Sequence, residues 1–329
     1  MSFNYFTSFR TIEVTDFLKA LGICLVVLNH SSWHNLEGGL NILILISGLN
    51  FARFSLKKGN TELAVDIARL LKKLLIPSLL LMGFYSLLFN KFDWKEIMLI
   101  SNFFYTQKIA AFPVWYVQVI TQLMLVIAVS AFMFNFAKWT RISLLGFSLV
   151  MLIFSILIPP FIDQYLSSAE LFWKLPHYIA WNFILGWVVW ACIEDENQSP
   201  VKLCICWLLI VISAFIVFQI YQDISINRFL IFSSFATVLL LFKKIQVPTI
   251  FYRLIVILAS AVFYIFLLHG GIMYVIQILM RDHFSYATIA VCKFFISISL
   301  CCMLFILITA TLNALKTVRE SSSKMSNNN

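Results

Sequence analysis

The chain has 329 residues, of which 61% are hydrophobic and 12% are charged, and its mean hydropathy is +0.93. This composition excludes a soluble globular domain and indicates an integral membrane protein. The length allows about ten spans of roughly 20 residues with short connections, which leaves no room for a sizeable soluble domain. We therefore expect the function to lie within a polytopic, all-α bundle of transmembrane helices.

The formal net charge of +9 would suggest nucleic-acid binding in a soluble protein, so its distribution along the chain matters. Apolar runs predict spans at roughly 14–33, 39–56, 74–90, 111–136, 141–159, 177–193, 202–221, 227–242, 254–279 and 286–314. With the N-terminus inside, 16 of the 24 lysines and arginines fall in inner segments and six in outer segments. The positive-inside rule then predicts that both termini are cytoplasmic, and no nucleic-acid partner is expected.

The ends of the chain suggest a single membrane domain. The first apolar run carries Asp16 and Lys19 and lacks a small-residue cleavage pattern after it, so we expect no cleavable signal peptide. We predict one transmembrane domain over residues 1–318 and a polar, disordered cytoplasmic tail over residues 319–329. The seven cysteines have no zinc-like spacing, and we expect no metal site.

The first predicted helix carries three ionisable residues on one face. Lys19 and His30 are eleven residues apart, or three helical turns, so they project from the same face about 16 Å apart. Asp16 lies within about 40° of that face. Such a stripe inside a bilayer must face protein or water. The alternative is that Asp16 and Lys19 only anchor the helix at one interface, with His30 at the opposite head groups.

Residues 57–73 begin with turn formers and continue with a helical apolar stripe, which predicts an interfacial helix ahead of the third span. The basic residues Arg69, Lys72 and Lys73 lie in this segment. They are explained either as positive-inside anchors or as a binding site for a multiply phosphorylated ligand. Residues 91–112 are too polar to span a bilayer and predict an outer loop or a re-entrant piece.

His269 lies in the ninth predicted span, sixteen residues after Arg253. His30 lies fourteen residues after Asp16, and both spans start from the cytoplasmic side, so the two imidazoles are predicted at similar depth in the outer half of the bilayer. A single neutral histidine in a span is often only an interhelical hydrogen-bonding group. Two at matched depth indicate a functional site.

The spacing of Lys19 and His30 resembles the first-helix signature of membrane-bound acyltransferase family 3, a basic residue followed after ten residues by histidine. Five further segments resemble family motifs in the same order: residues 46–49, 69–77, 113–117, 178–186 and 263–269. Each motif is weak alone, but six in order between about residue 10 and residue 315 are strong together. The sequence departs from the pattern at Lys19, which is usually arginine, at Phe266, which is commonly tyrosine, and at Val262, which is often serine. Lysine keeps the positive charge but loses the bidentate contact with phosphate.

The resemblance implies transfer of an acyl group, expected to be acetyl, from acetyl-CoA to a hydroxyl or amine of a cell-envelope carbohydrate or glycolipid. Acetyl-CoA would be a co-substrate, no cofactor would be permanently bound, and the protein would be a multi-pass protein of the inner (cell) membrane. Catalysis would rest on His30, as general base or as acyl carrier, with Lys19 and with Asp16 orienting that lysine.

The resemblance also suggests two binding regions. The donor phosphates would lie against basic residues on the inner side, namely Lys19, Arg69, Lys72 and Lys73. The acceptor would lie against residues farther out, namely Trp115, Tyr116, His269 and Asn182. For Trp115 and Tyr116 a position in the interfacial aromatic belt is the alternative explanation.

A second function class is compatible with the same composition. A transporter or flippase of a lipid-linked sugar would also use many spans with polar groups inside them. The sequence shows no paired glycine-broken or proline-broken helices in corresponding halves, which argues against this class. The identity of the acceptor, the acyl length and assembly into a homo-oligomer are left open by the sequence.

Overall fold

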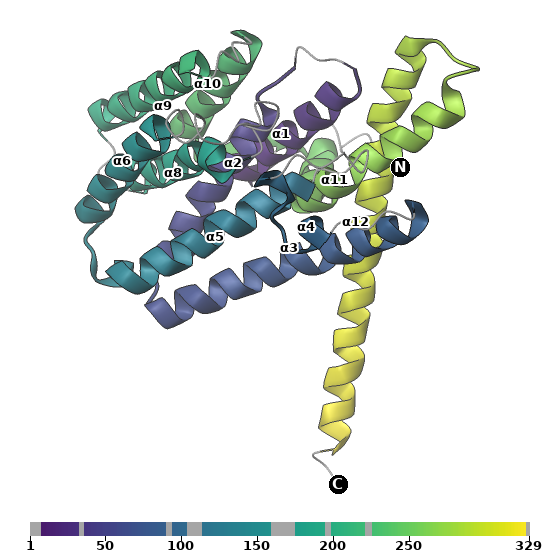
Figure 1. The fold of residues 1–329 in the computed structure, drawn as a ribbon, viewed down its shortest axis with the longest axis horizontal. Helices are drawn as coiled ribbons and strands as arrows, with labels where there is room; N and C mark the ends of the chain where they lie inside the picture. Colours follow the sequence, from purple (N-terminus) through teal and green to yellow (C-terminus); the bar gives the residue numbers. More distant parts are fainter. Residues whose placement is uncertain are drawn as a thin grey trace.

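The computed structural model describes residues 8–32, 36–89, 94–103, 114–158, 175–194, 199–220 and 226–326. Within these ranges the protein is a helical bundle with one small strand pair (Figure 1). The long helices are α1 (Val14–His30), α2 (Gly39–Phe51), α3 (Asn60–Phe89), α5 (Val114–Phe134), α6 (Arg141–Leu157), α8 (Pro176–Ile193), α9 (Pro200–Ile220), α10 (Ile226–Leu241), α11 (Thr249–Met280) and α12 (Tyr286–Ser326).

Each of the ten predicted spans coincides with one of these long helices. In the described part of the chain, six helical segments are long and apolar enough to cross a bilayer: Gly39–Leu56, Trp115–Phe134, Pro176–Ile193, Pro200–Gln219, Thr249–Met280 and Tyr286–Thr317. The protein is therefore an all-α integral membrane protein. Crossing by α1, α3, α6 and α10, and the cytoplasmic location of the termini, stay predictions.

The third helix differs from the expected pattern. The sequence suggested an interfacial helix over residues 57–73 and a separate span after it, whereas α3 is one helix of 30 residues that continues through Pro77. The Ser78 hydroxyl, which lies directly after the proline, donates a hydrogen bond of 2.7 Å to the Leu74 carbonyl. Residues preceding Pro77 and residues following it therefore belong to one continuous helix.

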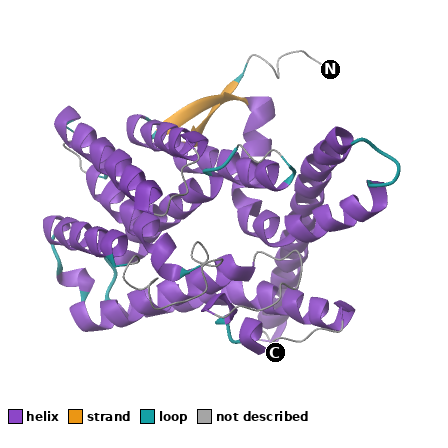
Figure 2. Ribbon diagram, turned by 45° about the horizontal axis from the view of Figure 1, so that its top comes forward, coloured by secondary structure: helices purple, strands orange, loops and turns teal. Residues whose placement is uncertain are grey.

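A short strand pair, not predicted from the sequence, joins the starts of two helices. Strand β1 (Phe9–Glu13) pairs antiparallel with β2 (Lys244–Pro248), with Phe9 opposite Pro248 and Glu13 opposite Lys244. Figure 2 shows the pair in orange at one edge of the bundle. The Arg10 guanidinium lies 5.4 Å from the centre of the Tyr252 ring, in the first turn of α11. Since α1 follows β1 and α11 follows β2, both helices begin at this end of the bundle.

Glycines allow α2 to pack directly on α8. A Cβ atom added to Gly48 would lie 1.9 Å from the Phe183 carbonyl oxygen, and one added to Gly186 would lie 2.3 Å from the Leu45 carbonyl oxygen. Small residues of this kind let helix backbones approach closely within membranes. The α2 helix is consequently buried on nearly all sides, between α1 and α8.

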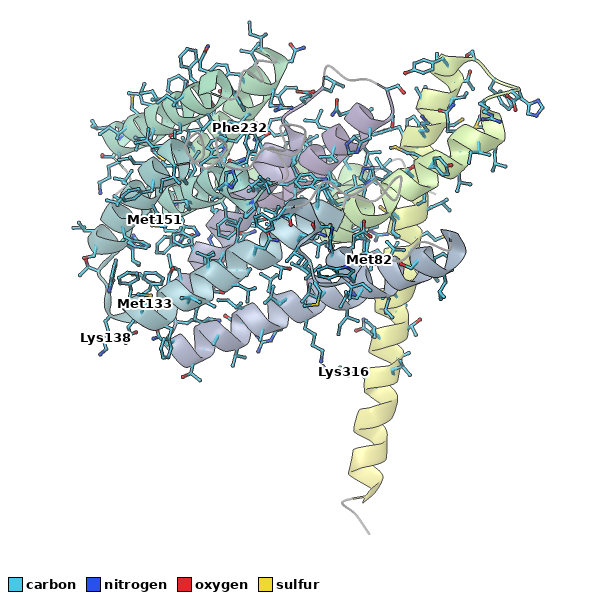
Figure 3. The ribbon with its side chains drawn as sticks, viewed as in Figure 1. Met82, Met133, Lys138, Met151, Phe232 and Lys316 are labelled. Atoms are coloured by element: carbon cyan, nitrogen blue, oxygen red, sulfur yellow. The ribbon has the colours of Figure 1, made fainter. Side chains whose placement is uncertain are left out.

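The last helix leaves the bundle. The first part of α12 packs against α11, and its C-terminal part, with Lys316, extends away from the other helices (Figure 3). The disordered tail predicted for residues 319–329 is helical up to Ser326, and residues 327–329 lie outside the described part. The sequence contains no glycine or proline between Tyr286 and Ser326, so nothing in the backbone chemistry ends the helix earlier.

The described part of the predicted outer loop or re-entrant piece packs against α5. It contains α4 (Trp94–Ile97) and a 3₁₀ turn, η3 (Ser101–Phe103). The Asn102 backbone N–H donates to Gln118 Oε1 at 3.1 Å, and the Asn102 side-chain amide donates to Gln122 Oε1 at 2.9 Å. These amides stabilise the polar segment against the first turns of α5, beside the helix end that carries Trp115 and Tyr116.

Candidate active site

The two histidines predicted at similar depth are in direct contact. His30 is the last residue of α1, and His269 lies in α11, which packs beside α1. His30 Nδ1 and His269 Nε2 are 2.6 Å apart, and the two rings are parallel to within 1°. His269 is fully buried, whereas His30 is exposed. The similar depth predicted for the two residues thus corresponds to a hydrogen-bonded pair.

The buried member of the pair is held by its own helix. His269 Nδ1 lies 2.8 Å from the Ile265 carbonyl oxygen and 2.9 Å from the Phe266 carbonyl oxygen, both in the preceding turn of α11. The Phe266 ring also contacts His269, with the ring centres 5.9 Å apart. These contacts fix the orientation of the His269 imidazole before any substrate is present.

Three aromatic side chains form a layer next to this pair. The centre of the Phe266 ring lies 4.5 Å from that of Tyr116 and 6.4 Å from that of Trp115. Trp115 and Tyr116 come from the first turn of α5, and the Phe266 ring contacts both of them as well as His269. Their predicted role in binding the acceptor stays a prediction.

A cavity of about 570 Å³ lies on the other side of this aromatic layer. Its size is within the range of about 300–1,000 Å³ that is usual for small-molecule sites. Its charged lining comes from α3, with Asp66, Arg69 and Lys73, and its aromatic lining includes Tyr116 and Phe266. The other lining residues are mostly apolar: Leu43, Ser47, Asn50, Phe51, Phe54, Ser55, Leu70, Leu74, Ile120, Met124, Phe183, Ala259, Ser260, Val262 and Phe263. Phe266 both lines this cavity and contacts His269, so it separates the cavity from the histidine pair.

An aspartate not singled out from the sequence organises the charged part of the cavity. Asp66 Oδ2 accepts a hydrogen bond from Lys58 Nζ at 2.5 Å, and Asp66 Oδ1 accepts one from Arg69 Nη1 at 3.0 Å. The Ser55 hydroxyl donates to the same carboxylate at 3.2 Å. The hydrogen bond from Lys58 is the main cause that lowers the pKa of Asp66 below its usual value of 3.8. The carboxylate is therefore ionised at neutral pH, and it holds two cations beside the cavity.

The remaining predicted residues lie outside the cavity lining. Lys19 Nζ donates to Asp16 Oδ1 at 2.8 Å, which agrees with the expected orientation of the lysine by the aspartate. Lys72 is exposed on α3 and does not line the cavity, whereas Arg69 and Lys73 do. Asn182 is buried, and its side-chain amide donates to the Asn41 carbonyl at 2.8 Å, which ties α8 to α2. The binding roles predicted for Lys19, Lys72 and Asn182 stay predictions.

One of the comparisons with known proteins identifies a family. A family model described as an acyltransferase domain matches residues 14–306 of the chain. The matched range contains both histidines and every residue that lines the cavity. No curated protein and no solved structure matches the chain.

Proposed function

The chain belongs to acyltransferase family 3, and on this premise we propose that it transfers an acyl group, acetyl in the simplest case, from acyl-CoA to a hydroxyl or amine of a cell-envelope carbohydrate or glycolipid. The observation that carries the proposal is the cavity beside the histidine pair. It combines two cationic side chains, Arg69 and Lys73, with a mostly apolar interior that ends at Tyr116 and Phe266.

This combination fits the two halves of acyl-CoA. The guanidinium of Arg69 and the ammonium of Lys73 suit the nucleotide phosphates, because cation–phosphate pairs form strong charge-assisted hydrogen bonds. The apolar lining suits the flexible arm that carries the thioester. Lys19 and Lys72 would contact the nucleotide outside the cavity. Arg69 would exchange part of its contact with Asp66 for a phosphate oxygen of the incoming donor.

The histidine pair supplies the base for transfer. In the proposed step, His30 takes the proton from the acceptor hydroxyl or amine. At the same time the oxygen or nitrogen of the acceptor attacks the thioester carbonyl. The new bond to the acyl carbon forms, the carbon–sulfur bond breaks, and the proton passes from His30 to the departing CoA thiolate. A route with a transient acyl group on His30 gives the same products. In either route the thioester must pass the layer formed by Tyr116 and Phe266.

The direct test is transfer of radiolabelled acetyl groups from acetyl-CoA to membrane glycolipids and polysaccharide by the purified chain in lipid vesicles. We expect His30→Ala to lower the rate by about 100-fold or more, the usual contribution of a general base. His283→Ala is the matched control, because His283 is exposed in the turn after α11 and belongs to neither the pair nor the cavity lining. Equal transfer by wild type and His30→Ala would remove His30 from the chemistry.

The same experiment separates transfer from transport. A flippase of a lipid-linked sugar would move label across the vesicle membrane without a covalent change in the lipid. Mass spectrometry of the product decides between the two, because transfer adds one acyl unit. The acyltransferase family match and the donor-sized cavity favour the transferase.

A further inference from the structure

We propose that His269 is a positioning residue that fixes the tautomer of His30, with the proton on Nδ1 and the basic lone pair on Nε2. The hydrogen-bond geometry of the pair carries this inference, and its catalytic meaning rests on the acyltransferase function proposed above. The general rule is that the hydrogen bond made by one ring nitrogen of histidine decides which nitrogen is protonated.

His269 Nδ1 faces two hydrogen-bond acceptors. It lies 2.8 Å and 2.9 Å from two backbone carbonyl oxygens, those of Ile265 and Phe266. Carbonyl oxygens accept hydrogen bonds and cannot donate them. His269 Nδ1 must therefore carry a proton. Because both carbonyls belong to the preceding turn of the same helix, this assignment holds as long as α11 is helical there.

The state of His269 decides which ring donates in the contact with His30. His269 is fully buried, and a charged group at such a position is costly to desolvate, so the neutral ring is the stable form. With Nδ1 protonated, neutral His269 presents a lone pair at Nε2. His30 Nδ1 lies 2.6 Å from that atom in a parallel ring, and two facing lone pairs at this distance would repel. His30 Nδ1–H therefore donates to His269 Nε2.

The tautomer of His30 follows from its role as donor in this hydrogen bond. With the proton on Nδ1, the lone pair of the neutral ring is on Nε2, the nitrogen that does not face His269. His269 is fully buried while His30 is exposed, so an acceptor reaches the pair from the side of His30. When Nε2 takes a proton from the acceptor, the Nδ1–H bond to His269 becomes charge-assisted and strengthens. A neutral imidazole thus performs the orienting task that a carboxylate performs in a Ser-His-Asp triad.

The test uses the full-length protein in lipid nanodiscs with ¹⁵N-labelled histidine. His30 and His269 are assigned by substitution among the five histidines, and ¹⁵N chemical shifts report which ring nitrogen is protonated at neutral pH. We expect the Nδ1–H tautomer at both positions. We expect His269→Gln to keep His30 in this form, since the glutamine carbonyl can accept from Nδ1–H, and His269→Leu to populate the Nε2–H form.

The kinetic arm uses the same variants. His269→Gln should keep kcat within about tenfold of wild type, and His269→Leu should lower kcat about 100-fold with the KM for acetyl-CoA unchanged. An Nε2–H tautomer of His30 in the wild type would overturn the inference whatever the activity. An unchanged kcat in His269→Leu would overturn the positioning role. The Nδ1–H tautomer at both positions in a protein that transfers no acyl group would refute the proposed function but not the tautomer assignment. If His269→Leu does not fold, the tautomers of the wild type and of His269→Gln still decide the test.

Discussion

Tyr116 and Phe266 place their ring centres 4.5 Å apart, at the boundary between the cavity and the histidine pair. One ring comes from α5 and the other from α11, so the boundary depends on the packing of two separate helices. In the proposed reaction the thioester crosses this boundary, and water must not follow it to the acyl carbon. The aromatic pair therefore has two tasks, to admit the donor arm and to exclude solvent.

We predict that Phe266→Ala converts part of the transfer activity into hydrolysis. Loss of the ring opens a path between the cavity and the exposed side of His30, so water can reach the thioester. The expected result is a several-fold rise in CoA release from acetyl-CoA in the absence of acceptor, measured with a thiol reagent. Phe263→Ala is the matched control, because Phe263 also lines the cavity but contacts Tyr264 rather than Tyr116. Equal hydrolysis by the two variants would contradict the boundary role.

We predict that Arg69 contributes more to donor binding than its neighbour Lys72. Arg69 lines the cavity and Lys72 does not, although they are three residues apart on α3. Hydrogen bonds to charged groups are worth about 1.5–3 kcal/mol, so Arg69→Ala should raise the Kd for acetyl-CoA about tenfold or more. Lys72→Ala should change it less than threefold. Isothermal titration calorimetry in detergent measures the Kd of both variants. An equal effect of the two substitutions would contradict this prediction and would support the donor site predicted from the sequence, which includes Lys72.

We predict that Asp66 stabilises the fold at neutral pH but not in acid. Its pKa is lowered in the folded protein, chiefly by the hydrogen bond from Lys58, so the ionised form favours folding. This contribution is present above the usual aspartate value of 3.8 and is lost as the pH falls through the lower pKa of the folded state. Asp66→Asn should therefore lower the Tm at pH 7, and the difference from wild type should shrink below about pH 4.

The control for this prediction is Asp282→Asn. Asp282 pairs with Arg281 at 3.5 Å in an exposed turn, where an ion pair contributes little to stability. Its substitution should leave the Tm unchanged across the same pH range. A Tm difference between wild type and Asp66→Asn that is the same at pH 7 and at pH 3.5 would assign the effect to packing rather than to the carboxylate charge.

The positions of the long helices could be predicted because each apolar run is bounded by charged or polar residues. The similar depth of His30 and His269 could also be predicted, because the regular rise of a helix gives the depth of a residue from its distance to the helix start. Their direct contact could not be predicted in this way. The strand pair could not be predicted, because its two strands, residues 9–13 and 244–248, are short and lie far apart in the sequence. The pairing is a property of the tertiary arrangement of α1 and α11.

The cavity could not be predicted from the sequence either, because it also depends on tertiary packing. It forms where α2, α3, α5 and α11 meet, and no local pattern states which face of α3 turns inward. The sequence therefore predicted Arg69, Lys72 and Lys73 as one cluster, while the structure separates Lys72 from the other two. The one local signal for Asp66 is its spacing of three residues before Arg69, which places the two side chains together on a helix.

The contact between α2 and α8 leads to a last prediction, on stability. Gly48→Ala should destabilise the protein by about 3 kcal/mol or more, because its Cβ would overlap the Phe183 carbonyl and force the helix backbones apart. Gly146→Ala is the matched control: Gly146 lies inside α6 with no atom within 4 Å of an added Cβ. There alanine should be neutral or stabilising by about 0.5–1 kcal/mol, since it replaces glycine inside a helix. Thermal unfolding followed by size-exclusion chromatography compares the two variants. Similar Tm values for both would show that α2 and α8 are not in the close contact described for Gly48 and Gly186.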